Sequence, residues 1–113
     1  MILENETMEQ LKERLNSSSK YLQSNDMRVI DVHEGYAKVE MVIDEQILNG
    51  HGFVHGGALF SLGDTAAGAA SFATGRDSVT LSASINYIKP GIGGKLIAIA
   101  QEISRGRTTG VYE

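Results

Sequence analysis

The glycine- and alanine-rich stretch 55–73 limits the possible folds of this chain more than any other. Its sequence, HGGALFSLGDTAAGAASFA, contains a single charged side chain, Asp64. Gly63 and Gly68 lie inside it, and glycine within a helix costs about 1 kcal/mol relative to alanine. A helix of such small girth is typical of close packing against a curved sheet, and Thr74–Gly75 provides a C-terminal stop. We therefore predict a central helix over about residues 55–73.

The flanking sequence predicts a second, shorter helix and an antiparallel sheet. Thr7 and Gln10 form a capping-box pattern, which predicts an amphipathic helix over residues 7–16 that the serines at 17–19 terminate. Apolar alternation predicts strands on both sides of a Glu34–Gly35 turn, and strict alternation places Val29 and Val32 on opposite faces of the first. Further strands are predicted at 78–87, 95–104 and, after a tight turn at 105–107, in the closing TTGVYE. The chain therefore reads as one α+β domain, residues 1–113.

Composition excludes several classes of function. The 113 residues carry a formal net charge of −4, and the lysines and arginines form no basic run, which argues against nucleic-acid binding. The absence of cysteine excludes disulfides, thiolate catalysis and cysteine-ligated zinc, and fits a reducing cytoplasm. The amino terminus, MILENETMEQ, is acidic and lacks the features of a signal peptide, and no stretch reads as a membrane span. We expect a cytoplasmic protein that binds neither membranes nor nucleic acid.

The central helix carries the residues with the clearest chemical potential. The backbone N–H groups of Gly56 and Gly57 lack acceptors at the positive end of the helix dipole, so they can hold an anion or polarise a carbonyl as an oxyanion hole does. Asp64 can act on that carbonyl as nucleophile or general base. The alternative is a structural carboxylate that hydrogen-bonds to a nearby hydroxyl such as Ser61 or Thr65.

Distance separates these two features within one chain. Eight helical residues place Asp64 about 12 Å along the axis from Gly56, which is beyond the reach of an aspartate side chain. If both groups serve one reaction, the carboxylate must come from a second copy whose helix runs in the opposite sense. The spacing therefore predicts an active site shared across a symmetric dimer.

The loop before this helix offers a weaker signal. His51 and His55 are four residues apart, but the glycines between and beside them favour a loop over a helical zinc site, so no metal is expected. We expect His51 to make structural hydrogen bonds. Asn49–Gly50 is a common turn dipeptide, and by itself it indicates a turn.

Together these residues resemble a known family. The pattern N-G-H-x3-H-G-G-x6-D, from Asn49 to Asp64, followed by a small-residue helix, resembles the hotdog-fold acyl-CoA thioesterases, and most closely their phenylacetate-degradation (PaaI-like) type. SASINYIKP and GGKLIAIAQEISRGRTTGVYE resemble the following strands, so the likeness covers about residues 25–113. It implies a long helix wrapped by an antiparallel sheet, paired subunits that assemble as a dimer of dimers, and no cofactor.

The resemblance also implies a role for individual residues. Asp64 resembles the catalytic carboxylate and Gly56 the oxyanion donor. Asn49 resembles the residue that positions the thioester or the attacking water, and His55 the histidine that lies near the sulfur or braces the loop. Thr80 resembles a hydroxyl that orients water.

Coenzyme A would also need groups that meet its phosphates. Gly57 offers a second backbone donor, and four basic residues are candidates for the mouth of a groove, although for any one of them a solvated charge at a strand end is the favoured interpretation. These are Arg76, Lys89, Arg105 and Arg107.

Two questions stay open at this level. The family continues beyond GVYE with another strand, so we expect either that the natural protein is longer or that its last strand is unusually short. The leading function is hydrolysis of an acyl-CoA thioester. The alternatives are a non-catalytic acyl-CoA binding module and an enoyl-thioester hydratase or dehydratase on the same fold.

Overall fold

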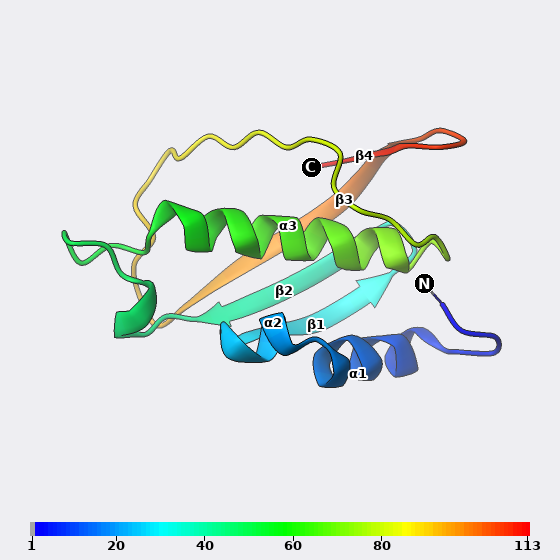
Figure 1. Ribbon diagram of the computed structural model, residues 1–113, viewed down its shortest axis with the longest axis horizontal. Helices are drawn as coiled ribbons and strands as arrows, with labels where there is room; N and C mark the ends of the chain where they lie inside the picture. Colours follow the sequence, from blue (N-terminus) through cyan, green and yellow to red (C-terminus); the bar gives the residue numbers. More distant parts are fainter. Residues whose placement is uncertain (1) are drawn as a thin grey trace.

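A four-stranded antiparallel sheet with a long helix across one face forms the body of the molecule (Figure 1). The computed structural model describes residues 2–113. The strands follow one another in the sheet in chain order: β1 (Met27–His33), β2 (Tyr36–Val42), β3 (Lys95–Arg105) and β4 (Gly110–Tyr112). Across them lies α3 (Gly56–Phe72), which confirms the predicted central helix and the hotdog architecture. No helix in the described part combines the length and apolar character needed to cross a bilayer.

The core lies between α3 and the sheet. The helix buries a stripe that consists mainly of alanines, so its backbone approaches the strands closely. Across from it, β1 and β2 contribute larger valine and methionine side chains. The buried hydrophobic members are Leu62, Ala66, Ala69 and Ala70 from the helix, and Met27, Val29, Val32, Ala37, Val39, Met41 and Ala100 from the sheet. The close-packing interpretation is confirmed for Ala66, Ala69 and Ala70, which are buried. It is wrong for Gly63 and Gly68, because a Cβ added at either position would meet no atom of the described chain outside its own stretch of helix within 4 Å.

Two short helices precede the sheet. In α1 (Met8–Ser18) the capping box between Thr7 and Gln10 forms as expected. The serines do not terminate it where predicted, because Ser17 and Ser18 donate back to the Arg14 carbonyl and so complete the last turn. Ser19 instead caps α2 (Lys20–Ser24), a helix of five residues that the sequence pattern did not indicate.

The predicted β1–β2 hairpin forms, with Gly35 at φ +73° in its turn. The facing of β1 differs from strict alternation, because a bulge lies between Val29 and Asp31. An extra residue at a bulge reverses the phase of a strand, so Val29 and Val32 both face the core. The prediction that they lie on opposite faces was wrong.

The predicted strand at 78–87 does not form. This segment is an extended connection that runs beside α3 (Figure 1), and its backbone lies outside the ladder of β1 to β4. Val79, Leu81 and Ile88 are 94%, 85% and 86% exposed. Alternating apolar residues favour a β-strand, but a strand also needs a neighbouring strand with which to pair. The described chain provides none here.

Candidate functional site

The first turn of α3 presents one free backbone donor. His55 caps the helix, and its Nδ1 accepts a hydrogen bond from the Gly57 N–H at 2.9 Å. The Gly56 N–H has no acceptor among residues 2–113. Of the two donors expected at this glycine pair, Gly57 is therefore engaged and Gly56 remains available at the positive end of the helix.

Tyr87 fixes the position of this first residue. Its hydroxyl donates to the Gly56 carbonyl at 3.0 Å, and its ring lies so close that a Cβ added to Gly56 would be 3.3 Å from Tyr87 Cζ. No periodicity links residue 87 to the start of a helix 31 positions earlier, so local sequence patterns do not reveal this contact.

The loop before α3 is organised by Asn49. Its Oδ1 accepts hydrogen bonds from the N–H groups of His51, at 2.9 Å, and Phe53, at 3.1 Å. The turn interpretation of this residue is confirmed. Its side-chain amide N–H2 has no acceptor in the described chain, so a donor remains free for a ligand.

A cavity of about 270 Å³ opens at this end of the molecule. It brings Asn49 and Gly56 together with the predicted phosphate-binding residue Lys89. The remaining lining is largely apolar, from Phe53, Val54, Leu59, Tyr87, Ile88, Pro90 and Gly91. A mainly apolar recess with a few convergent donors is typical of a small-molecule site.

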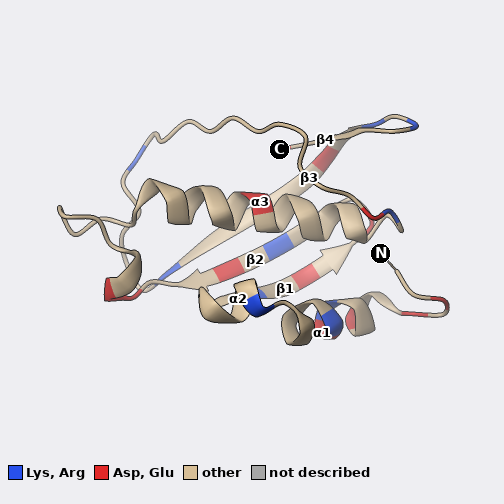
Figure 2. Cartoon of the chain, in the orientation of Figure 1, with Lys and Arg blue, Asp and Glu red and all other residues tan. Residues whose placement is uncertain are grey.

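Asp64 lies elsewhere on α3, where it is the only charged residue of the helix (Figure 2). Its Oδ1 accepts a hydrogen bond from the Thr80 hydroxyl at 2.6 Å. Neither Ser61 nor Thr65 is its partner, and Ser61 pairs with the Tyr21 hydroxyl at 2.7 Å instead. Within one chain Asp64 is exposed.

The structure thus brings Asp64 together with Thr80, and Gly56 together with Asn49, but it keeps the two pairs apart. Both Gly56 and Asp64 belong to α3, about 12 Å from each other along the axis. Asp64 does not line the cavity. One chain therefore contains two separate groups of functional residues, one with donors and one with a carboxylate.

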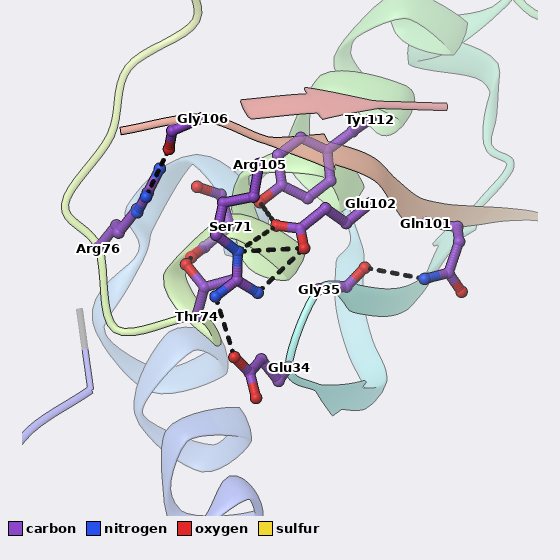
Figure 3. A network of polar contacts seen from close by, with 10 residues as sticks. All are labelled: Glu34, Gly35, Ser71, Thr74, Arg76, Gln101, Glu102, Arg105, Gly106 and Tyr112. Carbon is purple, nitrogen blue, oxygen red and sulfur yellow. Dashed lines mark hydrogen bonds and ion pairs between the residues drawn. The ribbon is translucent and has the colours of Figure 1, made fainter. Parts of the chain in front are cut away.

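A network of polar side chains lies beyond the C-terminal end of α3 (Figure 3). Arg105 hydrogen-bonds to Glu102 and Glu34, at 3.0 to 3.1 Å, and Tyr112 donates to Glu102 at 2.9 Å. Hydrogen bonds from Arg105 hold the pKa of Glu102 below its ordinary value. Arg105 is therefore engaged by two carboxylates within the chain.

The other predicted basic residues divide between the two ends of α3. Arg76 donates to the Gly106 carbonyl at 2.7 Å, and Arg107 is exposed in the adjoining turn between β3 and β4 (Figure 3 shows Arg76). Lys89 lies at the opposite end, in the cavity wall.

The His51 side chain is exposed without a hydrogen bond in the described chain, which contradicts its expected structural role. The difference follows from the exposure of this residue in a glycine-containing turn. Among residues 2–113, no three histidine or acidic side chains gather as metal ligands would.

Comparisons with known proteins give a consistent result. The model of the thioesterase superfamily matches residues 51–113. A protein of Archaeoglobus fulgidus is 38% identical over 106 residues, which cover 93% of this chain and 69% of that protein. The acyl-coenzyme A thioesterase PaaI of Escherichia coli is 43% identical over 86 residues, covering 75% of this chain and 61% of the enzyme.

Solved structures agree with these sequence matches. The E. coli PaaI protein superposes with a TM-score of 0.81 at 35% identity, over 90% of this chain and 80% of that one. A Streptococcus mutans protein bound to acetyl CoA superposes with a TM-score of 0.72 at 38% identity, over 76% of this chain and 70% of that one.

Proposed function

Because this chain belongs to the thioesterase superfamily, as a PaaI-like hotdog thioesterase, we propose that it hydrolyses an acyl-CoA thioester to a carboxylic acid and coenzyme A. The free Gly56 N–H carries the proposal. It lines a mainly apolar recess beside the free amide of Asn49, with no acceptor of its own. A thioester carbonyl placed there would satisfy both donors, and its developing negative charge would be stabilised by the start of α3.

The second half of the site comes from another copy of the chain. An aspartate cannot span the distance between Asp64 and Gly56 in one helix, whereas two α3 helices that pass antiparallel bring these residues together twice by symmetry. Each site then combines Asn49 and Gly56 of one chain with Asp64 of the partner subunit and Thr80 of the partner subunit. The homodimer, its pairing into a dimer of dimers and a cytoplasmic location stay predictions.

Two routes are consistent with this arrangement. As a nucleophile, the Asp64 carboxylate attacks the thioester carbon, the C–S bond breaks, the thiolate takes up a proton, and water then hydrolyses the anhydride. As a general base, the same carboxylate takes a proton from water as that water attacks the carbon; the C–S bond then breaks and the proton passes to the departing thiolate. In both routes the Thr80 hydroxyl occupies Oδ1 at 2.6 Å, which leaves Oδ2 to act. The net reaction consumes one water and needs no redox partner.

The basic residues suit the phosphates of coenzyme A. Lys89 lies in the wall of the cavity. When Asp64 of one α3 lies opposite Gly56 of the other, the C-terminal end of the first helix extends past the start of the second. Arg76 and Arg107, which flank that C-terminal end, would therefore approach the same groove from the chain that supplies Asp64. His55 caps α3 with its Nδ1, so its role in this scheme is to hold the first turn in place.

The proposal is tested by thiol release from short, medium, long and aryl acyl-CoA esters. We expect the wild-type protein to release free thiol and the Asp64→Asn protein to lose at least about 100-fold in kcat, since general-base or nucleophilic assistance is removed. Asp31→Asn, an exposed aspartate on β1, is the matched control and should behave as wild type. Circular dichroism and size-exclusion chromatography establish that all three proteins are folded and equally associated.

The outcomes distinguish the candidate functions. Free thiol release establishes hydrolysis, and the best substrate identifies the acyl class. Binding of acyl-CoA without turnover would support a binding module instead. An altered acyl chain on an intact thioester would support a hydratase or dehydratase.

A further inference from the structure

The hydrogen bonds that connect the extended segment 78–90 to α3 in the described chain all come from side-chain hydroxyls. The backbone of this segment makes no hydrogen bond to other backbone groups of the described chain. Three hydroxyls connect it to the helix instead: Ser78 to the Ser71 hydroxyl at 2.7 Å, Thr80 to Asp64 at 2.6 Å, and Tyr87 to the Gly56 carbonyl at 3.0 Å. The placement of Thr80 on Asp64 therefore depends on its neighbours along this segment.

The Ser71–Ser78 pair and the Asp64–Thr80 pair are successive hydrogen-bonded contacts between the segment and α3. Asp64 and Ser71 are seven residues apart, which is two helical turns, so they occupy the same face of α3. Ser78 and Thr80 are two residues apart, so in an extended chain their side chains leave on the same side. The segment and the helix are thus joined by two successive side-chain contacts.

Ser71 is a buried residue of α3. It is 8% exposed, the one polar side chain among the buried residues, while Ser78 is exposed. The Ser71 hydroxyl contacts both Ser78 and Tyr112, and its own position is set by the backbone of α3. The bond to Ser78 fixes the chain two residues before Thr80.

We propose that Ser78 is a positioning residue: through its hydrogen bond to Ser71 it holds the Thr80 hydroxyl on Asp64. This inference rests on the proposed function, in which Asp64 is the catalytic carboxylate. Ser78 itself contacts neither the cavity nor Asp64. Its effect on catalysis therefore passes through Thr80, and its loss should lower kcat without changing KM.

Steady-state thiol release from four variants tests this. Ser78→Ala should lower kcat about 3- to 10-fold, the equivalent of one net hydrogen bond, with KM unchanged. Ser78→Thr keeps the hydroxyl and should restore most of the rate. The double variant Ser78→Ala/Thr80→Ala should be no slower than Thr80→Ala within about twofold, because two residues that act in one chain of contacts are not additive.

Ser82→Ala provides the matched control. Ser82 lies two residues beyond Thr80 on the same segment, is exposed, and makes no hydrogen bond in the described chain. The kcat of the Ser82→Ala protein should therefore equal that of wild type. A purely structural role for Ser78 predicts additive losses in the double variant instead.

Three results overturn the inference alone, provided that Asp64→Asn is inactive: a wild-type kcat for Ser78→Ala, a wild-type kcat for Thr80→Ala, or losses that multiply in the double variant. An Asp64→Asn protein with wild-type activity overturns the catalytic role of Asp64, and the inference with it.

Discussion

Gly56 meets two demands that no other residue type meets together. Its N–H lines the cavity without an acceptor in the described chain. Its lack of a side chain also leaves room for the Tyr87 ring, whose Cζ would be only 3.3 Å from an added Cβ. The first demand concerns catalysis and the second concerns packing, so substitution at this position can separate them.

Proline and alanine at residue 56 differ in whether the backbone N–H is present. Both add a Cβ against Tyr87, but only proline removes the N–H. Proline is favoured at the first position of a helix, and His55, at φ −59° and ψ 138°, already has the conformation that precedes a proline. We expect Gly56→Pro to lose about 100-fold or more in kcat relative to Gly56→Ala, as for removal of one oxyanion donor. Equal thiol-release rates for the two folded variants would contradict an oxyanion role for this amide.

At the scale of elements, a two-pronged ion pair connects the residues before α1 to that helix. Glu6 accepts from Arg14 Nε at 2.8 Å and Arg14 Nη2 at 3.0 Å, and also from the Leu3 N–H at 3.0 Å. The hydrogen bonds from Arg14 and then from Leu3 lower the pKa of Glu6 from 4.5 to about 2. The ionised carboxylate therefore stabilises the folded state relative to the unfolded one.

This pair predicts how stability depends on pH. Because the folded pKa lies below the unfolded one, its contribution is fully present above pH 4.5 and is lost as pH falls toward about 2. The free energy of unfolding of Glu6→Gln should thus lie below that of wild type at neutral pH, and the gap should narrow through this acid range. Urea unfolding at a series of pH values measures it. Glu4→Gln, an exposed neighbour, is the control; a gap that is independent of pH would refute the assignment.

The elements also mark what sequence alone can predict. Local sequence patterns predict the α3 helix and the β1–β2 hairpin. Local spacing also selects Asn49, Gly56 and Asp64 as candidate site residues. The five-residue α2 is too short to display a helical period, and a bulge in β1 has no distinct sequence pattern. The contact of Tyr87 with Gly56 is set by tertiary packing, so local pattern does not contain it.

The segment 78–87 failed as a strand for a reason that concerns the whole molecule. Its hydroxyls face α3, while Val79, Leu81 and Ile88 are exposed, which reverses the usual arrangement of polar and apolar groups. An extended chain with free backbone groups and outward apolar side chains is suited to cover by another chain. This observation and the separated halves of the site both favour an assembly with a second copy.

A shared site predicts that two inactive variants restore each other. Gly56→Pro retains Asp64, and Asp64→Asn retains the Gly56 amide, so a mixed dimer contains one site with both groups intact and one with neither. When the variants are coexpressed in equal amounts, half of the dimers are mixed and each has one working site of two. Thiol release should therefore recover to about a quarter of the wild-type rate. The two homodimers, purified separately and assayed before subunits exchange, should stay inactive. If the catalytic groups instead act within one chain, no mixed dimer contains a working site, and coexpression recovers nothing.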